Sequence, residues 1–306
     1  MSDAVDVVTG GAGFIGSHLA ETLLARGRRV RVVDNFATGR RSILPRGVDL
    51  VEGDVNEVAG AAFRGASVVY HLAALPSVPR SVKHPLESHQ ATARGTLTAL
   101  AAAEQTGVKR LVFASSSSVY GDTPTLPKHE RMPPRPLSPY AAAKLAGELY
   151  AASWASRGVL ETVSLRFFNV YGPRQDPDSP YAAVIPLFSR KLREGKRMTV
   201  YGDGGQTRDF TFVTDVVEGL IRAGTSPGVS GRVYNLAGGR PVSVLDMGKT
   251  LARLSDKAAD FEFLPPRPGD IRDSFADVDA ARRDLGFSAA VPLEEGLRRT
   301  LGWAAS

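Results

Sequence analysis

The chain has 306 residues, of which 43% are hydrophobic and 23% charged, with no cysteine and a formal net charge of +6. This composition is that of a globular protein, and the length predicts one large or two coupled domains. It excludes disulfides and thiolate chemistry, and no apolar run is long enough to span a membrane. The start, "MSDAVDVVTGG", lacks a secretory signal pattern, so we expect a cytoplasmic protein.

The positive charge is spread along the chain. No basic stripe alternates with aromatic residues, so we expect no nucleic-acid partner. A solvated, Arg-rich surface explains the charge, which would also suit an anionic substrate. The histidines show no metal-ligand spacing, and we expect no metal site.

The first half alternates short β-branched runs with helical patterns. We expect strands at 5–9, 29–34, 48–54, 67–74, 110–116 and 161–172. We expect helices at 14–26, 91–107 and 139–158. Strands separated by helices imply crossover connections and therefore a parallel sheet.

The pattern changes after Gly172, where "PRQDPDSPYAA" predicts a loop leading to a second unit. We therefore predict an α/β fold: a Rossmann-type, doubly wound parallel sheet with a smaller C-terminal α/β substrate domain. The predicted domains are 1–172 and 173–306, with a later strand near 232–237 returning to the first. The second unit would cover the edge of the sheet where such folds bind ligands.

A glycine-rich turn, "TGGAGFIG", lies between the first strand and the first helix. Gly10 would allow the tight turn, Gly13 would let a pyrophosphate approach the backbone, and Gly16 would let helix pack on strand. The helix N-terminus adds N–H donors and a positive dipole. This pattern predicts dinucleotide binding, and the first domain is its site.

Asp34 ends the next strand, where a carboxylate binds the adenosine ribose hydroxyls and repels a 2′-phosphate. It therefore predicts NAD rather than NADP. Arg40 and Arg41 leave NADP as an alternative, because arginine can hold that phosphate. After the third strand, Asp54 and Val55 are candidates for the adenine edge.

"SPYAAAK" places Tyr140 and Lys144 on one face of a helix, with Ser138 as N-cap and Pro139 at the first helical position. Lys144, the helix dipole and the nicotinamide charge would lower the pKa of Tyr140 from its ordinary value near 10. Alone, the pair could be a core tyrosine and a surface lysine. Beside the glycine turn and the serines of "FASSSSVYG", it predicts an active site.

Six motifs occur in order along the chain: "TGGAGFIGS", "SSSSVYG", "SPYAAAKLAGE", "LRFFNVYGPRQDP", "YGDGGQTRDF" and "RPGDIRDSFADVDAARRDLGF". Together they resemble the extended short-chain dehydrogenase/reductase family, and within it the nucleotide-sugar 4-epimerases. The resemblance implies an isomerase that holds NAD throughout: Tyr140 takes the proton of the sugar 4-hydroxyl while C4 gives up hydride, and hydride returns to the other face of the 4-keto sugar. Counting back from "VYG", Ser116 falls on the catalytic Ser/Thr position, and Lys144 would also hold the nicotinamide ribose.

The resemblance also implies further contacts. It adds to the cofactor site Phe14, Ile15, Asn35, Leu72, Ala73 and Ala74. To a UDP-sugar it assigns Arg80, Ser116, Ser117, Ser118, Asn169, Ala183, Val184, Tyr201, Arg208, Arg267, Asp270 and Ser274. It further implies a homodimer, for which helices 91–107 and 139–158 are candidates.

Two positions of the serine run bear on the reaction. Related sugar 4,6-dehydratases carry an Asp-Glu pair where this chain has Ser117 and Ser118, and related decarboxylases carry Glu at the second position. Hydroxyls do not serve as general bases near neutral pH. The resemblance therefore favours epimerisation at C4.

The substrate is less defined. Ser274 stands where hexose-restricted epimerases carry a tyrosine, which leaves room for an acetamido group at C2. "SVPRSV" also resembles epimerases of N-acetylated sugars. We expect UDP-GlcNAc/UDP-GalNAc, UDP-Glc/UDP-Gal, or both. UDP-glucuronate, met by Arg80 or a serine, stays open, as do a dehydratase, decarboxylase or reductase on the same scaffold and a non-catalytic NAD-binding regulator.

Overall fold

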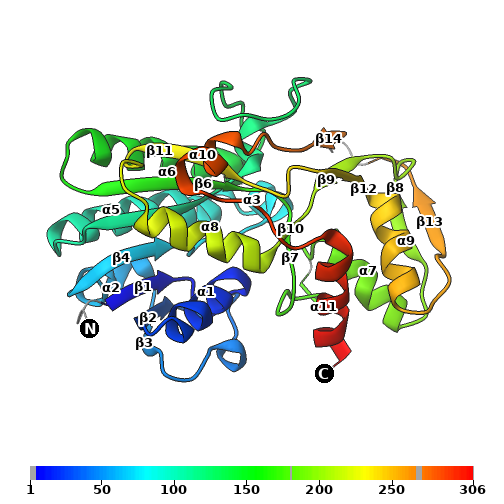
Figure 1. Ribbon diagram of the computed structural model, residues 1–306, viewed down its shortest axis with the longest axis horizontal. Helices are drawn as coiled ribbons and strands as arrows, with labels where there is room; N and C mark the ends of the chain where they lie inside the picture. Colours follow the sequence, from blue (N-terminus) through cyan, green and yellow to red (C-terminus); the bar gives the residue numbers. More distant parts are fainter. Residues whose placement is uncertain (1–4, 180, 267–270, 306) are drawn as a thin grey trace.

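The computed structural model describes residues 5–179, 181–266 and 271–305. Its centre is a parallel sheet with the strand order β11-β6-β5-β4-β1-β2-β3 (Figure 1). The strands are β1 (Val5–Thr9), β2 (Arg29–Asp34), β3 (Asp49–Glu52), β4 (Ala66–His71), β5 (Arg110–Ser116), β6 (Glu161–Phe167) and β11 (Arg232–Leu236). The order reverses direction between β1 and β4, which is where such sheets open a ligand crevice.

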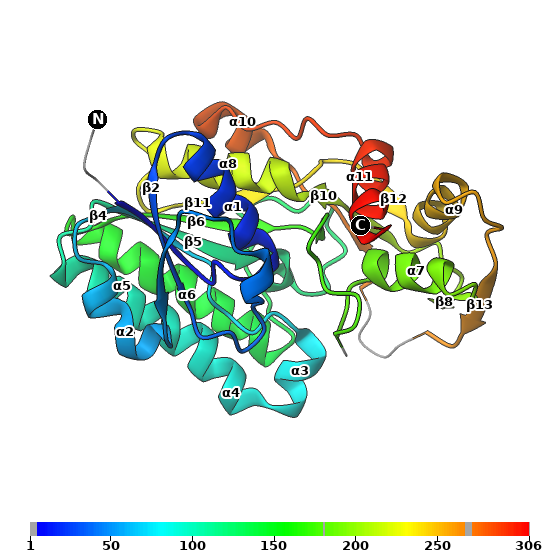
Figure 2. The ribbon, with the colours of Figure 1, turned by 90° about the horizontal axis from the view of Figure 1, so that it is seen from below.

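Helices cover both faces of this sheet, as the turned view shows (Figure 2). One face carries α1 (Phe14–Ala25), α8 (Val213–Thr225) and α10 (Asp279–Leu285). The other carries α2 (Val55–Ala62), α5 (Gly95–Gln105) and α6 (Pro139–Ser156). Because both faces are covered, every residue of β1 is buried. Its residues other than Asp6 and Thr9 are valines.

Short helical turns connect these layers. They are η1 (Arg41–Ile43), α3 (Val78–Lys83), α4 (Pro85–His89), η2 (Gln90–Arg94) and η3 (Ser117–Tyr120). The η2 turn is π-helical and leads directly into α5, so the helix expected at 91–107 begins with a wider turn. The serine run expected at the end of a strand divides between β5 and η3.

The second unit is built from small sheets. Its strands pair β13 (Phe261–Leu264) with β8 (Met198–Tyr201), and β9 (Thr207–Asp209) with β12 (Pro241–Ser243) and β14 (Asp273–Ser274). Its helices are α7 (Val184–Arg193), α9 (Val244–Leu254) and α11 (Leu293–Ala305). They share an apolar core with β8, and β7 (Val170–Tyr171) pairs with β10 (Thr211–Phe212) where the two units meet.

The predicted fold class is confirmed: the molecule is an α/β protein with a Rossmann-type parallel sheet. The segment expected as one strand at 161–172 ends at Phe167, and the strand expected at 67–74 ends at His71. Residues after 172 supply α8, β11 and α10 to the sheet layer, so the two units interleave along the chain. The domain boundary at residue 172 stays a prediction.

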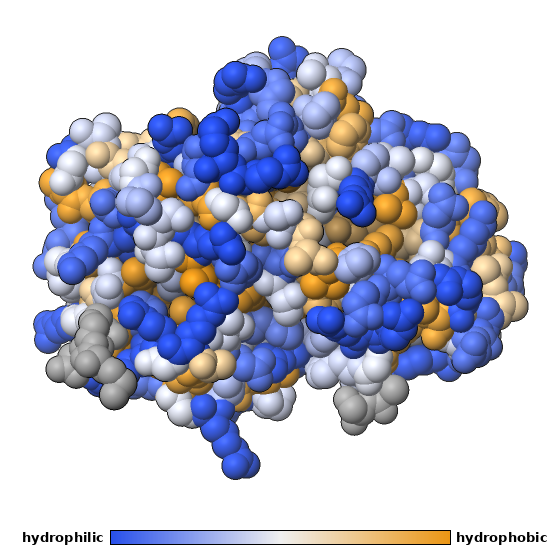
Figure 3. Space-filling model, in the orientation of Figure 1, coloured by the Kyte–Doolittle hydropathy of each residue, from blue (hydrophilic) through white to orange (hydrophobic). Residues whose placement is uncertain are grey.

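The surface seen in Figure 3 is largely hydrophilic, with apolar residues scattered over it. Among the described residues, no helix combines the length and apolar character that crossing a bilayer requires. The same residues contain no cluster of His, Asp or Glu suited to a metal ion.

Candidate active site

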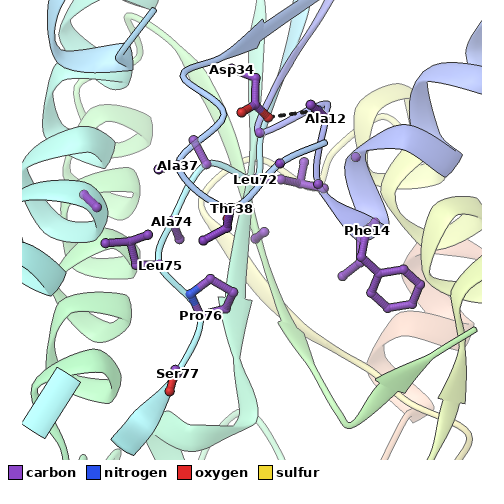
Figure 4. Close-up of a pocket in the computed structure, with 18 of the residues that line it drawn as sticks. Ala12, Phe14, Asp34, Ala37, Thr38, Leu72, Ala74, Leu75, Pro76 and Ser77 are labelled. Carbon is purple, nitrogen blue, oxygen red and sulfur yellow. Dashed lines mark hydrogen bonds between the residues drawn. The ribbon is translucent and has the colours of Figure 1, made fainter. Parts of the chain in front are cut away.

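A cavity of about 720 Å³ opens at the carboxyl ends of the central strands. Loops after β1, β2 and β4 supply one end of its lining, as Figure 4 shows around Asp34, Leu72 and Phe14. The end of β5, the start of α6 and the segment after β6 supply the other. It therefore brings the two sequence signals, the glycine turn and the Tyr–Lys helix, into one space.

The glycine turn leaves space that a side chain would fill. Gly10 has a φ of +70°, and a Cβ there would lie 2.8 Å from the Ala73 backbone N. A Cβ on Gly16 would lie 2.2 Å from the carbonyl O of Gly10. The helix α1 has Gly13 as its N-cap, without a side-chain cap, so its first N–H groups remain open to an anion. The turn therefore fits the pyrophosphate of a dinucleotide.

Asp34 is held at the neighbouring strand end. Its Oδ2 accepts a hydrogen bond from the Ala12 N–H at 2.9 Å (Figure 4), and its Oδ1 accepts one from the Phe36 N–H at 2.8 Å. Burial raises the pKa of this carboxyl, while these two bonds oppose the rise. The carboxylate is thus positioned at the cavity wall, where it suits a ribose diol.

The two arginines that left NADP open have other partners. Arg40 donates to the carbonyl O of Arg174 at 2.9 Å. Arg41 pairs with Glu52 and lies over the Phe36 ring. Because both guanidinium groups are engaged in this way, the site agrees with NAD.

Asp54, expected at the adenine edge, is held by hydrogen bonds at the cavity wall. Its carboxylate caps α2 by accepting from the Asn56 N–H at 2.8 Å, and it also accepts from the Asn35 side chain at 2.9 Å. Both side chains line the cavity, as does Val55.

Tyr140 and Lys144 face the end of β5. Ser138 caps α6 by accepting from the Ala141 N–H at 3.2 Å, which places Tyr140 in the first helical turn. Lys144 Nζ donates to the carbonyl O of Ala114 at 2.7 Å and lies 5.8 Å from the centroid of the Tyr140 ring. Tyr140 is also hydrogen-bonded to Ser116.

Burial shifts the pKa of both members of this pair. Burial raises the pKa of Tyr140 to about 12, and the bond to Ser116 only partly opposes the rise. Burial lowers the pKa of Lys144 to about 7, while the nearby Glu148 carboxylate raises it. In the protein without NAD, burial therefore raises the pKa of Tyr140, and its lowering by Lys144, the helix dipole and the nicotinamide together stays a prediction.

The four serines have different roles in the packing. Ser116 Oγ accepts from Ser118 Oγ at 2.9 Å and from the Ser118 N–H at 3.2 Å. Ser115 turns the other way and donates to Glu148. Ser115, Ser116 and Ser117 line the cavity, whereas Ser118 is not among its lining residues.

Most predicted site residues line this one cavity. They are Gly10, Gly13, Phe14, Ile15, Gly16, Asp34, Asn35, Asp54, Val55, Leu72, Ala73, Ala74, Arg80, Ser116, Ser117, Tyr140, Lys144, Asn169 and Ala183. Val184 begins α7 directly after Ala183. Tyr201, Arg208 and Ser274 lie outside the lining, in the second unit, where Ser274 and Arg208 are register partners on β14 and β9. Arg267 and Asp270 lie outside the described residues.

The cavity has further lining residues that the sequence reading did not single out. They include Thr38, Ser77, Gln90, Gln175, Asp176 and Tyr181. Gln175 and Asp176 belong to the Pro- and Asp-rich loop interpreted as a connection. The signal that could have found them is position, because loops after the strands of a parallel sheet converge at its carboxyl edge.

The fold and the cavity are those of an α/β dinucleotide-binding protein, with Ser116, Tyr140 and Lys144 grouped at one end of the cavity. The model of the NAD dependent epimerase/dehydratase family matches residues 7–237, and the chain belongs to that family. It is therefore an enzyme whose cofactor is NAD, and the glycine turn with Asp34 is the part of the structure that fits this cofactor.

Relatives whose names state an activity align with nearly the whole chain. The UDP-glucose 4-epimerase of Mycolicibacterium smegmatis is 39% identical, with 96% of each chain covered. A UDP-N-acetylglucosamine 4-epimerase from Methanobrevibacter ruminantium, solved with UDP-N-acetylmuramic acid, is 36% identical with a TM-score of 0.95, covering 100% of this chain and 99% of its own. A UDP-glucuronic acid 4-epimerase from Bacillus cereus, solved with UDP-glucuronic acid and NAD, is 32% identical with a TM-score of 0.91, covering 98% and 99%.

Proposed function

We propose that this enzyme inverts the configuration at C4 of a UDP-sugar through a 4-keto intermediate. The observation that carries the proposal is the group at the end of β5: Tyr140 bonded to Ser116, Lys144 beside it, and hydroxyls rather than carboxylates at Ser117 and Ser118. The relatives named above support the same activity.

The residues act through proton transfer and orientation. NAD, when bound, would supply the hydride acceptor and donor for C4, and its nicotinamide would add positive charge to the site. Tyr140 takes the proton of the 4-hydroxyl as the ketone forms and gives it back after the sugar has turned over. Ser116 holds the same oxygen and relays its proton, with Ser118 as its second hydrogen-bond partner. Lys144 supplies a positive charge that favours the Tyr140 phenolate and also holds the nicotinamide ribose.

The hydroxyl side chains argue against elimination and decarboxylation. Both reactions need an acid or base beyond the tyrosine. The serine run, of which Ser117 lines the cavity, supplies hydroxyls and no carboxylate. A dehydratase, decarboxylase or reductase, and a non-catalytic regulator, therefore rank behind the epimerase.

For the sugar, we propose the UDP-GlcNAc/UDP-GalNAc pair, the UDP-Glc/UDP-Gal pair, or both. Ser274, register partner of Arg208, is the small residue expected to leave room at C2. In this proposal Arg208 and Arg267 hold the diphosphate, and Asp270 holds the uridine ribose. Tyr201 contacts the uracil, Asn169 contacts the sugar or the diphosphate, and Ala183 and Val184 close over the nucleotide.

UDP-glucuronate remains the second candidate, since a relative binds it. The side chain expected to meet its carboxylate, Arg80, donates to Glu87 at 2.6 Å. A sugar carboxylate would have to share this guanidinium with Glu87, whose like charge favours a neutral sugar.

The test is incubation of the purified protein with each UDP-sugar and resolution of the C4 epimers by NMR. We expect an equal-mass isomer and no net NADH. Loss of water or carbon dioxide, or stoichiometric NADH, would assign one of the other reactions instead.

We further propose a homodimer through α5 and α6, in a cytoplasmic enzyme. Large apolar side chains are exposed on these helices and on α3 and α4, which pack on α6: Leu149 is 63% exposed, Leu86 80% and Val82 63%. A second copy would bury them. Light scattering should give a dimer mass for the parent and a monomer mass for Leu149→Glu, and a monomeric parent would exclude the dimer.

A further inference from the structure

Behind the serine cluster, on the side away from the cavity, lies a buried ion pair that the proposed mechanism does not use. Arg166, on β6, donates to Glu148, on α6, through Nε at 2.9 Å and Nη2 at 2.7 Å. The two side chains are only 4% and 5% exposed. The guanidinium also lies over the Tyr120 ring, 4.6 Å from its centroid.

Glu148 is attached to the catalytic strand as well. Its Oε1 accepts a hydrogen bond from Ser115 Oγ at 2.5 Å, and Ser115 is the register partner of Arg166. Because side chains alternate along a strand, turning Ser115 toward α6 turns Ser116 toward the cavity. The bond from Ser115 thus selects the orientation of the serine that bonds Tyr140.

The contacts form a ladder between one strand and one helix. Three consecutive residues of β5 bond three residues of α6 that are one turn apart: Ser116 with Tyr140, the Ala114 carbonyl with Lys144, and Ser115 with Glu148. Residues spaced in this way share a helix face. Of these three contacts, that of Glu148 lies farthest from the cavity. Glu148 can therefore act on the site only through the other two contacts.

Its charge also reaches Lys144. Burial lowers the pKa of Lys144, and Glu148 is the group that raises it. Among the groups facing the lysine, His71 on β4 is neutral, since burial lowers its pKa to about 3. Tyr140 on the same helix is uncharged until it loses its proton, and Arg166 on β6 is neutralised by Glu148 itself.

Burying a salt bridge is a poor way to gain stability, because well-packed apolar residues often serve as well. The position of this pair therefore calls for another explanation. We propose that Glu148, held by Arg166, is a positioning residue: it sets the orientation of the β5 serines and keeps Lys144 positively charged beside Tyr140. This inference rests on the proposed 4-epimerase function.

The first test compares Glu148→Gln with Ser115→Ala in the NAD-loaded enzyme. Losing the Glu148 charge should move the basic limb of kcat, where Lys144 gives up its proton, to lower pH by about one unit. We expect kcat to fall about tenfold, with KM for the UDP-sugar within about twofold, because no substrate contact is lost. Ser115→Ala keeps the charge, so it should lower kcat without moving the limb.

A direct readout does not depend on turnover. With isotope-labelled lysine, the Nζ signal of Lys144, assigned by its loss in Lys144→Met, should titrate at lower pH in Glu148→Gln than in the parent. If Glu148→Gln does not fold, Glu148→Leu/Arg166→Met replaces both charges with apolar side chains. It should shift the titration in the same direction but by less, because the positive charge of Arg166 is removed together with the negative charge of Glu148.

The outcomes separate the two proposals. An unchanged Lys144 titration in the folded variant would overturn the role of Glu148, even if turnover fell. A parent that epimerises no UDP-sugar would refute the proposed function, while the lysine titration would still decide the inference.

Discussion

The sheet layer and the second unit hold their charged side chains in different ways. At the end of β5, Glu148 and Arg166 pair while almost fully buried, and Lys144 is 3% exposed. In the second unit the pair between Arg197 and Asp260 is 59% and 64% exposed, and that between Arg272 and Asp203 is 60% and 63% exposed. Buried charges act strongly on their neighbours, whereas exposed ones are screened by solvent.

We expect the two regions to contribute differently, the sheet layer to the chemistry and the second unit to the choice of sugar. The proposed reacting groups stand at the end of a strand of seven residues and on a helix of 18 residues. The residues proposed to select the sugar stand on strands of two and three residues, β14 and β9. Substitutions in the second unit should therefore alter which sugar is used, while substitutions at β5 and α6 should alter the chemistry of every sugar.

The largest effect should come from removing the proposed base. Tyr140→Phe keeps the ring but cannot accept the proton, so we expect kcat to fall about a thousandfold on every UDP-sugar. Bound NAD, measured after release by denaturation, should match the parent. Turnover close to the parent would show that another group is the base.

Asp209 is the exception in the second unit, a fully buried carboxylate on β9. It accepts hydrogen bonds from the N–H groups of Gly239 and Ala276, both at 3.1 Å, and burial raises its pKa to about 6. Above the ordinary carboxyl pKa, the folded state holds this proton more tightly than the unfolded state does. Stability should therefore be highest below about pH 4 for this group and fall by about 3 kcal/mol as the pH rises to 6.

The variant Asp209→Asn should remove this contribution to the pH dependence. Urea unfolding between pH 4 and 6 would measure it, with the free energy of unfolding of Asp209→Asn changing less across that window. Equal slopes for parent and variant would mean that Asp209 does not titrate there.

A smaller and more selective effect is expected at Ser274. Ser274→Tyr should lower kcat/KM for UDP-GlcNAc and UDP-GalNAc about tenfold, because the ring takes the space of the acetamido group. The UDP-Glc/UDP-Gal pair should change less than twofold, and Ser274→Ala should leave both pairs unaffected. Equal loss on both pairs would show that Ser274 does not select between them.

The smallest effect should come from an exposed pair. Asp260→Asn removes the partner of Arg197, and we expect the free energy of unfolding to change by less than about 1 kcal/mol. Denaturant titration would measure this. A larger loss would contradict the contrast between buried and exposed charges.

Much of the sheet layer could be predicted because its signals are local. The strand at Val5–Thr9, the glycine turn and the helix from Phe14 follow one another directly, and Ser138 and Pro139 mark the start of the helix that carries Tyr140. The second unit was predicted only as a region. Its strands of two to four residues carry too little periodicity to be located, and β8 pairs with β13 across about sixty residues of chain.

The sequence by itself determined the approximate positions of the main strands, the cofactor motif and the spacing of Tyr140 and Lys144, since each is a pattern of residues close together in the chain. Only the tertiary structure decided the surroundings of these groups. The contact of Arg166 with Glu148 joins a strand to a helix, and the amides on Asp209 come from two distant segments. Burial also decided the pKa of Tyr140, because desolvation depends on everything packed around a group rather than on its neighbours in sequence.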